Sequence, residues 1–169
     1  MNKPFNELSK YGLNTPEFSL KGKECYCRVV SVYDADTLTV VMPLFDSYYR
    51  FNIRLLGIDC PEMKSKILEN KKKAIRARNQ VIQWLLPNQK INLDEAYTKK
   101  QIQEMLSQDV AIVWIKCEEY EKFGRILANI YSNMNDSDNL SYSNRLISEG
   151  LAYSYMGGTK LTEEEQLNM

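Results

Sequence analysis

Two carboxylates and an arginine lie close together in the segment from Arg54 to Glu62. The segment reads Arg-Leu-Leu-Gly-Ile-Asp-Cys-Pro-Glu, so Asp59 and Glu62 follow Arg54 within a few residues. Pro61 stands between the two acids, and its ring restricts the backbone that separates them. Arginine matches the oxygens of a phosphate, and carboxylates bind hard cations or activate water. These residue types point to phosphate and metal chemistry.

The composition limits how such chemistry could work. The 169 residues include no histidine, and 22 basic residues balance 22 acidic ones. Acid–base catalysis near neutral pH would therefore fall to carboxylates. A zero net charge provides no overall field to attract a polyanion, so contact with nucleic acid would need a local patch. The four cysteines lack the paired spacing of a zinc site, and we expect buried free thiols.

The first 20 residues are polar and contain no apolar leader, and no later stretch is long and apolar enough to span a bilayer. We therefore expect an arm over residues 1–20 and one domain over residues 21–169. We also expect an intracellular, cytoplasmic protein without membrane contact, and no obligate protein partner is evident.

Three strands precede the segment or lead into it. Residues 24–32, 37–42 and 48–56 are rich in β-branched and aromatic residues or alternate between apolar and polar positions. Turn-forming residues separate them, which indicates a meander of antiparallel strands. Arg54 falls on the opposite face of its strand from Ile53 and Leu55.

The period changes from about residue 71, where apolar residues fall on one helical stripe that ends before Pro87. We expect Asn79 to lie away from this stripe. The helix carries a cluster of basic residues: Lys71, Lys72, Lys73, Arg76 and Arg78. They could line a nucleic-acid path, although a solvated helix face is the commoner explanation and the one favoured here. Residues 87–108 are interpreted as an insertion, in which Thr98 and Gln101 form a capping box for a short helix.

Two further strands are expected at residues 110–117 and 126–131, the first of them buried and central. Ser141 can cap a helix that stops at Gly150, and Thr162 begins a second capping box. The order is therefore three strands, a helix, an inserted short helix, two strands and small C-terminal helices. It predicts an α+β protein, mainly β, built on a five-stranded OB-fold barrel with a helix between strands three and four.

Four short segments place acids or arginines where turns would present them: Asp34-Ala35-Asp36-Thr37, Arg54, Asp59-Cys60-Pro61-Glu62 and Gly124-Arg125. Together, and in this order, they resemble the staphylococcal nuclease (thermonuclease) family. That family has an Asp-x-Asp-Thr turn, an Arg-Leu-x-x-x-Asp-x-Pro-Glu corner and an aromatic-Gly-Arg turn on an OB-fold barrel. The resemblance runs from about residue 24 to residue 158.

The resemblance implies a calcium-dependent nuclease that cleaves DNA, RNA or both with little base specificity and leaves 3′-phosphate ends. Asp36 and Asp59 would be calcium ligands, with the backbone carbonyl of Cys60 as a third. Glu62 would act on water, as a general base or by orienting it. Arg54 and Arg125 would clamp the phosphate, which planar guanidinium groups suit.

The resemblance also implies substrate contacts for Lys122, Tyr153 and Tyr155. The tyrosines could stack on bases or could simply be packing residues. Asp34 is expected to cap its turn, since Asp side chains favour such corners.

Two non-catalytic functions remain as alternatives to a nuclease. Arg54 and Glu62 could form a structural ion pair. The barrel could then be a weak or inactive module that binds nucleic acid, or a scaffold that holds a protein partner through residues 87–108.

Overall fold

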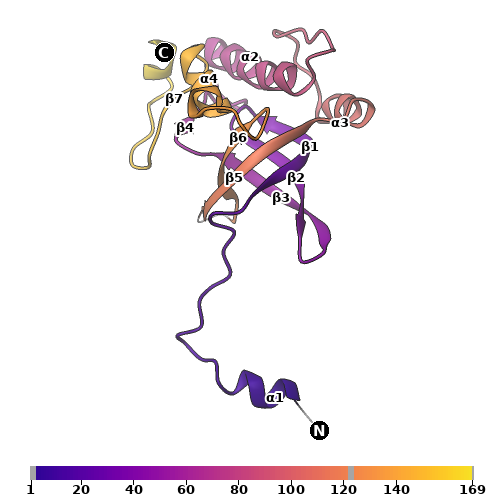
Figure 1. Ribbon diagram of the computed structural model, residues 1–169. Coiled ribbons are helices and arrows are strands. Elements are labelled where there is room, and N and C mark those ends of the chain that lie inside the picture. Colours follow the sequence, from indigo (N-terminus) through magenta and orange to yellow (C-terminus); the bar gives the residue numbers. More distant parts are fainter. Residues whose placement is uncertain (1–2, 122–123, 169) are drawn as a thin grey trace.

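The computed structural model describes residues 3–121 and 124–168, and its centre is a closed barrel of five strands (Figure 1). The strands are β1 (Glu24–Asp34), β2 (Thr37–Leu44), β3 (Ser47–Leu55), β5 (Ile112–Tyr120) and β6 (Ile126–Tyr131). Their order around the barrel is β1-β2-β3-β6-β5. Only β3 and β6 pair in parallel, and the other barrel neighbours are antiparallel. The predicted five-stranded barrel is confirmed.

Alternating side chains build the barrel core. In β2, the buried positions are Leu38, Val40 and Met42, and the residues between them are only partly buried. This two-residue period fills the barrel interior with apolar side chains. The register pairs Thr37 of β2 with Arg54 of β3, so the end of β3 lies beside the turn between β1 and β2.

Strand β5 is buried on one face only. Val113, Ile115 and Cys117 point into the core, whereas Ile112 remains 51% exposed. The predicted buried central strand is paired on both edges but buried only on its inner face, because β5 belongs to a barrel whose outer surface here is open to solvent. An uninterrupted apolar run does not distinguish these two settings.

A second, two-stranded sheet follows the barrel, and the sequence pattern did not predict it. Strand β4 (Ile58–Asp59) pairs antiparallel with β7 (Tyr153–Ser154), which opposes Asp59 to Tyr153. Gly57 precedes β4 at a φ of +79°, a left-handed conformation that favours glycine. The pair brings the C-terminal part of the chain to the corner after β3.

Helix α2 (Leu68–Leu85) lies across one end of the barrel (Figure 1). Its buried stripe includes Val81 and Ile82, as the periodicity predicts. Asn79 is also fully buried, which corrects its expected place on the polar face. Its Nδ2 donates hydrogen bonds to the carbonyls of three residues of the following loop, at 2.7 to 3.1 Å. Burial of an amide is tolerated because these bonds satisfy it.

The basic residues of α2 do not form one continuous face. Lys72 pairs with Glu69 at 2.8 Å, and Lys73 donates to the carbonyls of Gln166 and Leu167 at 3.1 and 2.8 Å. Arg78 is buried rather than solvated. A path for nucleic acid along this helix is therefore not supported, and the solvated-face interpretation does not extend to Arg78.

Three predicted caps are present. Thr98 and Gln101 form the capping box of α3 (Lys99–Gln108), whose Ile102 and Leu106 are buried in the core. Ser141 accepts a hydrogen bond from Asn144 N at the start of α4 (Tyr142–Ser148). Thr162 and Glu165 make the third box, although the element there is the short 3₁₀ helix η2 (Glu165–Asn168). A second 3₁₀ helix, η1, spans Asp138–Leu140.

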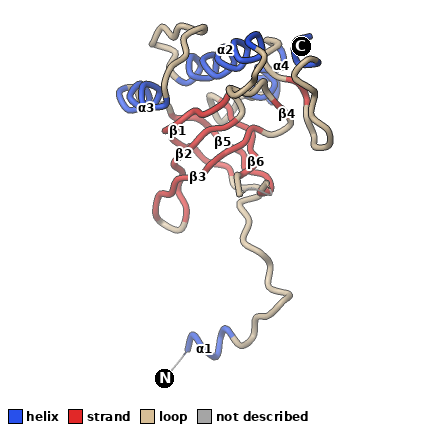
Figure 2. The backbone as a smooth tube through the Cα atoms, turned by 180° about the vertical axis from the view of Figure 1, so that it is seen from behind, coloured by secondary structure: helices blue, strands red, loops and turns tan. Residues whose placement is uncertain are grey.

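The N-terminal segment extends away from the barrel (Figure 2). It contains helix α1 (Lys3–Leu8) and an exposed stretch that reaches the core at Leu20, which is 4% exposed. None of the helices in residues 3–121 and 124–168 has the length and apolar character to cross a membrane. The cysteines are free thiols, buried at Cys27, Cys60 and Cys117 and partly buried at Cys25.

Candidate active site

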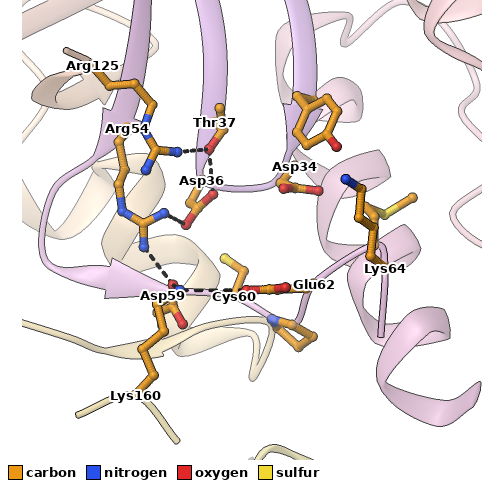
Figure 3. Close-up of a pocket in the computed structure, with 13 residues that line it drawn as sticks. Asp34, Asp36, Thr37, Arg54, Asp59, Cys60, Glu62, Lys64, Arg125 and Lys160 are labelled. Atoms are coloured by element: carbon orange, nitrogen blue, oxygen red, sulfur yellow. Dashed lines mark hydrogen bonds and ion pairs between the residues drawn. The ribbon is translucent and has the colours of Figure 1, made fainter. Parts of the chain in front are cut away.

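One pocket of about 250 Å³ collects the charged residues that the sequence singled out (Figure 3). It opens at the end of the barrel where the β1–β2 turn, the end of β3 and strand β4 meet. The residues lining it are Tyr33, Asp34, Asp36, Thr37, Arg54, Asp59, Cys60, Pro61, Glu62, Met63, Lys64, Arg125 and Lys160. Residues separated by more than 100 positions therefore share one site.

Arg54 bridges two buried carboxylates. Its Nη1 lies 2.6 Å from Asp36 Oδ2, and its Nη2 lies 2.6 Å from Asp59 Oδ1. Asp36 is 4% exposed and Asp59 is 2% exposed. Burial favours the neutral form of Arg54, but the two carboxylates outweigh it and raise the pKa of the guanidinium. The proposed pairing of Arg54 with Glu62 was wrong, since Arg54 pairs with these two aspartates instead.

The pKa values of the two aspartates shift in opposite directions because the two carboxyls have different donors. Burial raises the pKa of Asp36 despite the opposing charge of Arg54 and a 2.9 Å hydrogen bond from Thr37 Oγ1. Burial also acts on Asp59, but hydrogen bonds from Tyr153, Lys160 and Arg54 outweigh it and lower its pKa. Asp59 is consequently the more firmly ionised member of the pair.

Arg125 is held at the edge of the pocket by its own loop. Its Nε and Nη2 lie 2.6 and 2.8 Å from the two carboxylate oxygens of Glu121, a bidentate contact. Its Nη1 donates to Thr37 Oγ1 at 3.3 Å, and Thr37 in turn donates to Asp36. Arg125 is thus linked to Asp36, one of the two carboxylates that Arg54 contacts, through one intervening hydroxyl. Glu121 was not among the site residues predicted from the sequence.

Glu62 is the exposed carboxylate of the site. Its side chain is 67% exposed, and Lys160 Nζ lies 3.8 Å from Glu62 Oε1. The same ammonium lies 2.9 Å from Asp59 Oδ1. Exposure leaves Glu62 accessible to water. Lys160 was missed by the sequence analysis, and no local pattern around it could have shown that it reaches this corner.

Asp34 does not cap the β1–β2 turn. Its Oδ1 is buried and accepts no hydrogen bond from residues 3–121 or 124–168. Burial, followed by the negative charges of Asp36 and Glu62, raises the pKa of Asp34 to about 6. The carboxyl lines the pocket instead, where Figure 3 shows it across from Arg54. Its Oδ1 oxygen has no donor among residues 3–121 and 124–168.

Comparison with known proteins settles the family. The model for staphylococcal nuclease homologues matches residues 52–169, which is most of the chain. The chain belongs to the staphylococcal nuclease family. The matched range includes Arg54, Asp59, Glu62 and Arg125, whereas Asp36 lies before it. No curated protein matches the chain.

The three residues expected to contact substrate differ in their position relative to the pocket. The hydroxyl of Tyr153 donates to Asp59 Oδ2 at 2.6 Å and accepts from Leu161 N at 3.3 Å. Tyr153 therefore contacts a pocket residue without being part of the pocket lining. Tyr155 lies outside the pocket lining, and its hydroxyl donates to Gly158 O at 2.9 Å. Lys122 lies outside the described residues.

The oxygen donors of the site are of the type that binds calcium, the ion typical of the nuclease family. They do not form a complete coordination shell. Within the described part of the chain, no three acidic or thiol side chains form a metal-binding group. Asp36 and Asp59 nevertheless supply hard carboxylate oxygens, and the carboxyl of Asp34 lines the same pocket. Calcium accepts such oxygens together with backbone carbonyls and water. The residues present therefore fit this ion, with part of its shell left to solvent and substrate.

Proposed function

We propose that the chain is a calcium-dependent nuclease that hydrolyses phosphodiester bonds of DNA, RNA or both with low sequence specificity. The observation that supports this best is the convergence of five charged side chains on one pocket: Asp36, Arg54, Asp59, Glu62 and Arg125. Each matches in type the residue that the family pattern has at its position. A single structural ion pair would not require this assembly.

Arg54 and Arg125 bind the scissile phosphate in this proposal. A guanidinium has five N–H groups, and Arg54 uses three in its contacts with Asp36, Asp59 and the carbonyl of Ile58. The remaining N–H groups can donate to phosphate oxygens. Arg125 keeps the second hydrogen of Nη1 for the same purpose while Glu121 fixes its orientation. Charge that develops on the phosphate oxygens is then met by donors already in place.

Glu62 acts on the attacking water. Its exposed carboxylate can accept a proton from water as the water oxygen bonds to phosphorus. The bond between phosphorus and the 5′-oxygen breaks, and that oxygen takes up a proton from solvent water. The products are a 3′-phosphate and a 5′-hydroxyl. The chain contains no histidine to compete for this role.

Calcium would be held by Asp36, Asp59 and the carbonyl of Cys60. When bound, it supplies positive charge that polarises the phosphate and stabilises its negative transition state. The thiol of Cys60 takes no part, because burial raises its pKa well above the usual range and keeps it neutral. Tyr153 positions Asp59 through its short hydrogen bond.

Base selectivity should be low in this arrangement. The pocket offers charges for the phosphate backbone, which carries no sequence information. Lys122, Tyr153 and Tyr155 remain our candidates for contacts with the flanking nucleotides. Aromatic rings in such positions can stack on any base.

The test is cleavage of end-labelled single-stranded DNA and RNA by the whole chain in calcium, with chelator added to a parallel sample. We expect cleavage in calcium, none in EDTA, and fragments that end in a 3′-phosphate. A folded protein that binds these substrates but leaves them intact would instead be a binding module. Cleavage that continues in EDTA would contradict the calcium requirement.

A further inference from the structure

Lys160 brings a cation from the C-terminal part of the chain into the acidic corner of the pocket. Its Nζ lies 2.9 Å from Asp59 Oδ1 and 3.8 Å from Glu62 Oε1. Figure 3 shows the side chain rising toward these acids from the segment beneath them. The proposed calcium ligand Asp59 and the proposed base Glu62 therefore share one ammonium group.

The segment that carries Lys160 is fixed on both sides of it. Before Lys160, strand β7 pairs with β4, and the hydroxyl of Tyr155 donates to Gly158 O. After it, Leu161 N donates to the hydroxyl of Tyr153 at 3.3 Å. Farther along, Asn70 of α2 donates to Glu163 O at 2.6 Å. The fold thus holds the backbone on both sides of Lys160, and the side chain reaches the acids from there.

Two cations contact the two buried aspartates directly. Asp36 and Asp59 contribute two buried negative charges, and Arg54 supplies one positive charge between them. Lys160 supplies the second. Leaving a carboxylate buried without a cation is unfavourable, so the pair needs this charge or a replacement for it.

Three donors compete with a divalent cation for Asp59 while all of these contacts persist. Asp59 Oδ1 already receives Arg54 Nη2 at 2.6 Å and Lys160 Nζ at 2.9 Å, and Oδ2 receives the hydroxyl of Tyr153 at 2.6 Å. Lys160 is the contact that can be given up most easily. Its side chain is 45% exposed, against 11% for Arg54, so water can solvate the released ammonium.

We propose that Lys160 occupies the cation position of the site in the absence of metal and is displaced from Asp59 and Glu62 when a divalent cation binds. The proposal rests on the calcium site inferred above. It makes Lys160 a competitor that lowers calcium affinity, and it keeps the buried acids neutralised when calcium is scarce. Displacement would also release Glu62 from its ammonium neighbour when the metal arrives.

The test is equilibrium calcium binding by titration calorimetry with the whole chain, comparing wild type with Lys160→Met. Methionine keeps an apolar stem and removes the charge. The control is Lys64→Met, because Lys64 lines the same pocket but pairs with no acid among the described residues. We expect Lys160→Met to bind calcium about 10-fold more tightly than wild type, and more tightly than Lys64→Met, since only a contacting charge competes directly.

Proton exchange of the Lys160 ammonium, followed by NMR in the wild-type chain, gives a second readout that does not depend on activity. Calcium should speed this exchange, because the ammonium loses its contacts with Asp59 and Glu62. An unchanged exchange rate in calcium-bound protein would contradict displacement. Suppose that the wild type binds calcium and that the two lysine variants bind it with equal affinity. This result would overturn the role of Lys160 and would leave the calcium site in place. Absence of calcium binding in wild type and Lys160→Met would overturn the calcium site, and the competition with it. Lys160→Gln repeats the comparison if Lys160→Met fails to fold.

Discussion

Replacing Glu62 with glutamine should lower the rate of phosphodiester cleavage by about 10²- to 10⁴-fold, the usual contribution of a positioned general base. Glutamine keeps the size and the hydrogen-bonding oxygen of the side chain but cannot accept a proton from water. Because Glu62 is exposed and its neighbour Lys160 is partly exposed, folding should be unchanged. Single-turnover cleavage of single-stranded DNA in saturating calcium measures the effect on the chemical step.

The control for this variant is Glu164→Gln, which removes an exposed carboxylate from the C-terminal segment outside the pocket lining. It should cleave at the wild-type rate. If Glu62→Gln also cleaved at the wild-type rate with its fold intact, Glu62 would have no part in activating water. A thermal unfolding curve for each variant separates loss of chemistry from loss of structure.

Replacing Arg125 with alanine should lower the cleavage rate by about 10²- to 10³-fold, the effect of removing one donor from a developing oxyanion. The loss should fall mainly on kcat, because the charge that Arg125 meets grows as the bond to phosphorus forms. Its partner Glu121 is partly exposed and can be solvated in the variant, so the barrel should remain folded. Steady-state kinetics on a short oligonucleotide separate kcat from KM.

Arg125→Lys provides the sharper comparison, since it keeps the charge and loses the planar fork. Lysine cannot reproduce the bidentate contact with Glu121 or the simultaneous contact with Thr37. We expect it to recover only part of the lost rate. Full activity in either Arg125 variant would remove this residue from the phosphate clamp.

Much of the barrel was predictable because local patterns carry the information. Alternation in residues 37–42 placed Leu38 inside, and the same rule placed Arg54 away from the core. The capping boxes at Thr98 and Thr162 have fixed spacings that depend on only four residues. These features succeed because neighbours in sequence decide them.

The short sheet of β4 and β7 was not predictable in the same way. Strands of two residues are too short to show alternation, and their pairing joins positions about 95 apart in sequence. As a result, the contact between Tyr153 and Asp59 was not foreseen, although both residues were candidates for the site. Lys160 and Glu121 were missed for a related reason, since nothing near them in sequence indicates which carboxylate or guanidinium they reach.

Residue type also misled where a polar side chain is buried. Asn79 was placed on the polar face of α2 because asparagine is usually exposed, yet it holds the backbone of the following loop. Asp34 was assigned to a turn because aspartate favours such corners, yet its carboxyl lines the pocket. In both cases the deciding contacts lie outside the element that carries the residue.

The rate of cleavage as a function of calcium concentration, measured for wild type and Asp59→Asn, tests the central claim most directly. Asparagine removes the charge of the proposed ligand while keeping its shape. We expect wild type to show saturable activation that EDTA reverses. The variant should need a calcium concentration at least about 10-fold higher for half-maximal activation, because changes at metal sites commonly weaken affinity by this factor or more. Wild-type cleavage without calcium, or the same calcium dependence in both proteins, would contradict a calcium-dependent nuclease site at Asp59.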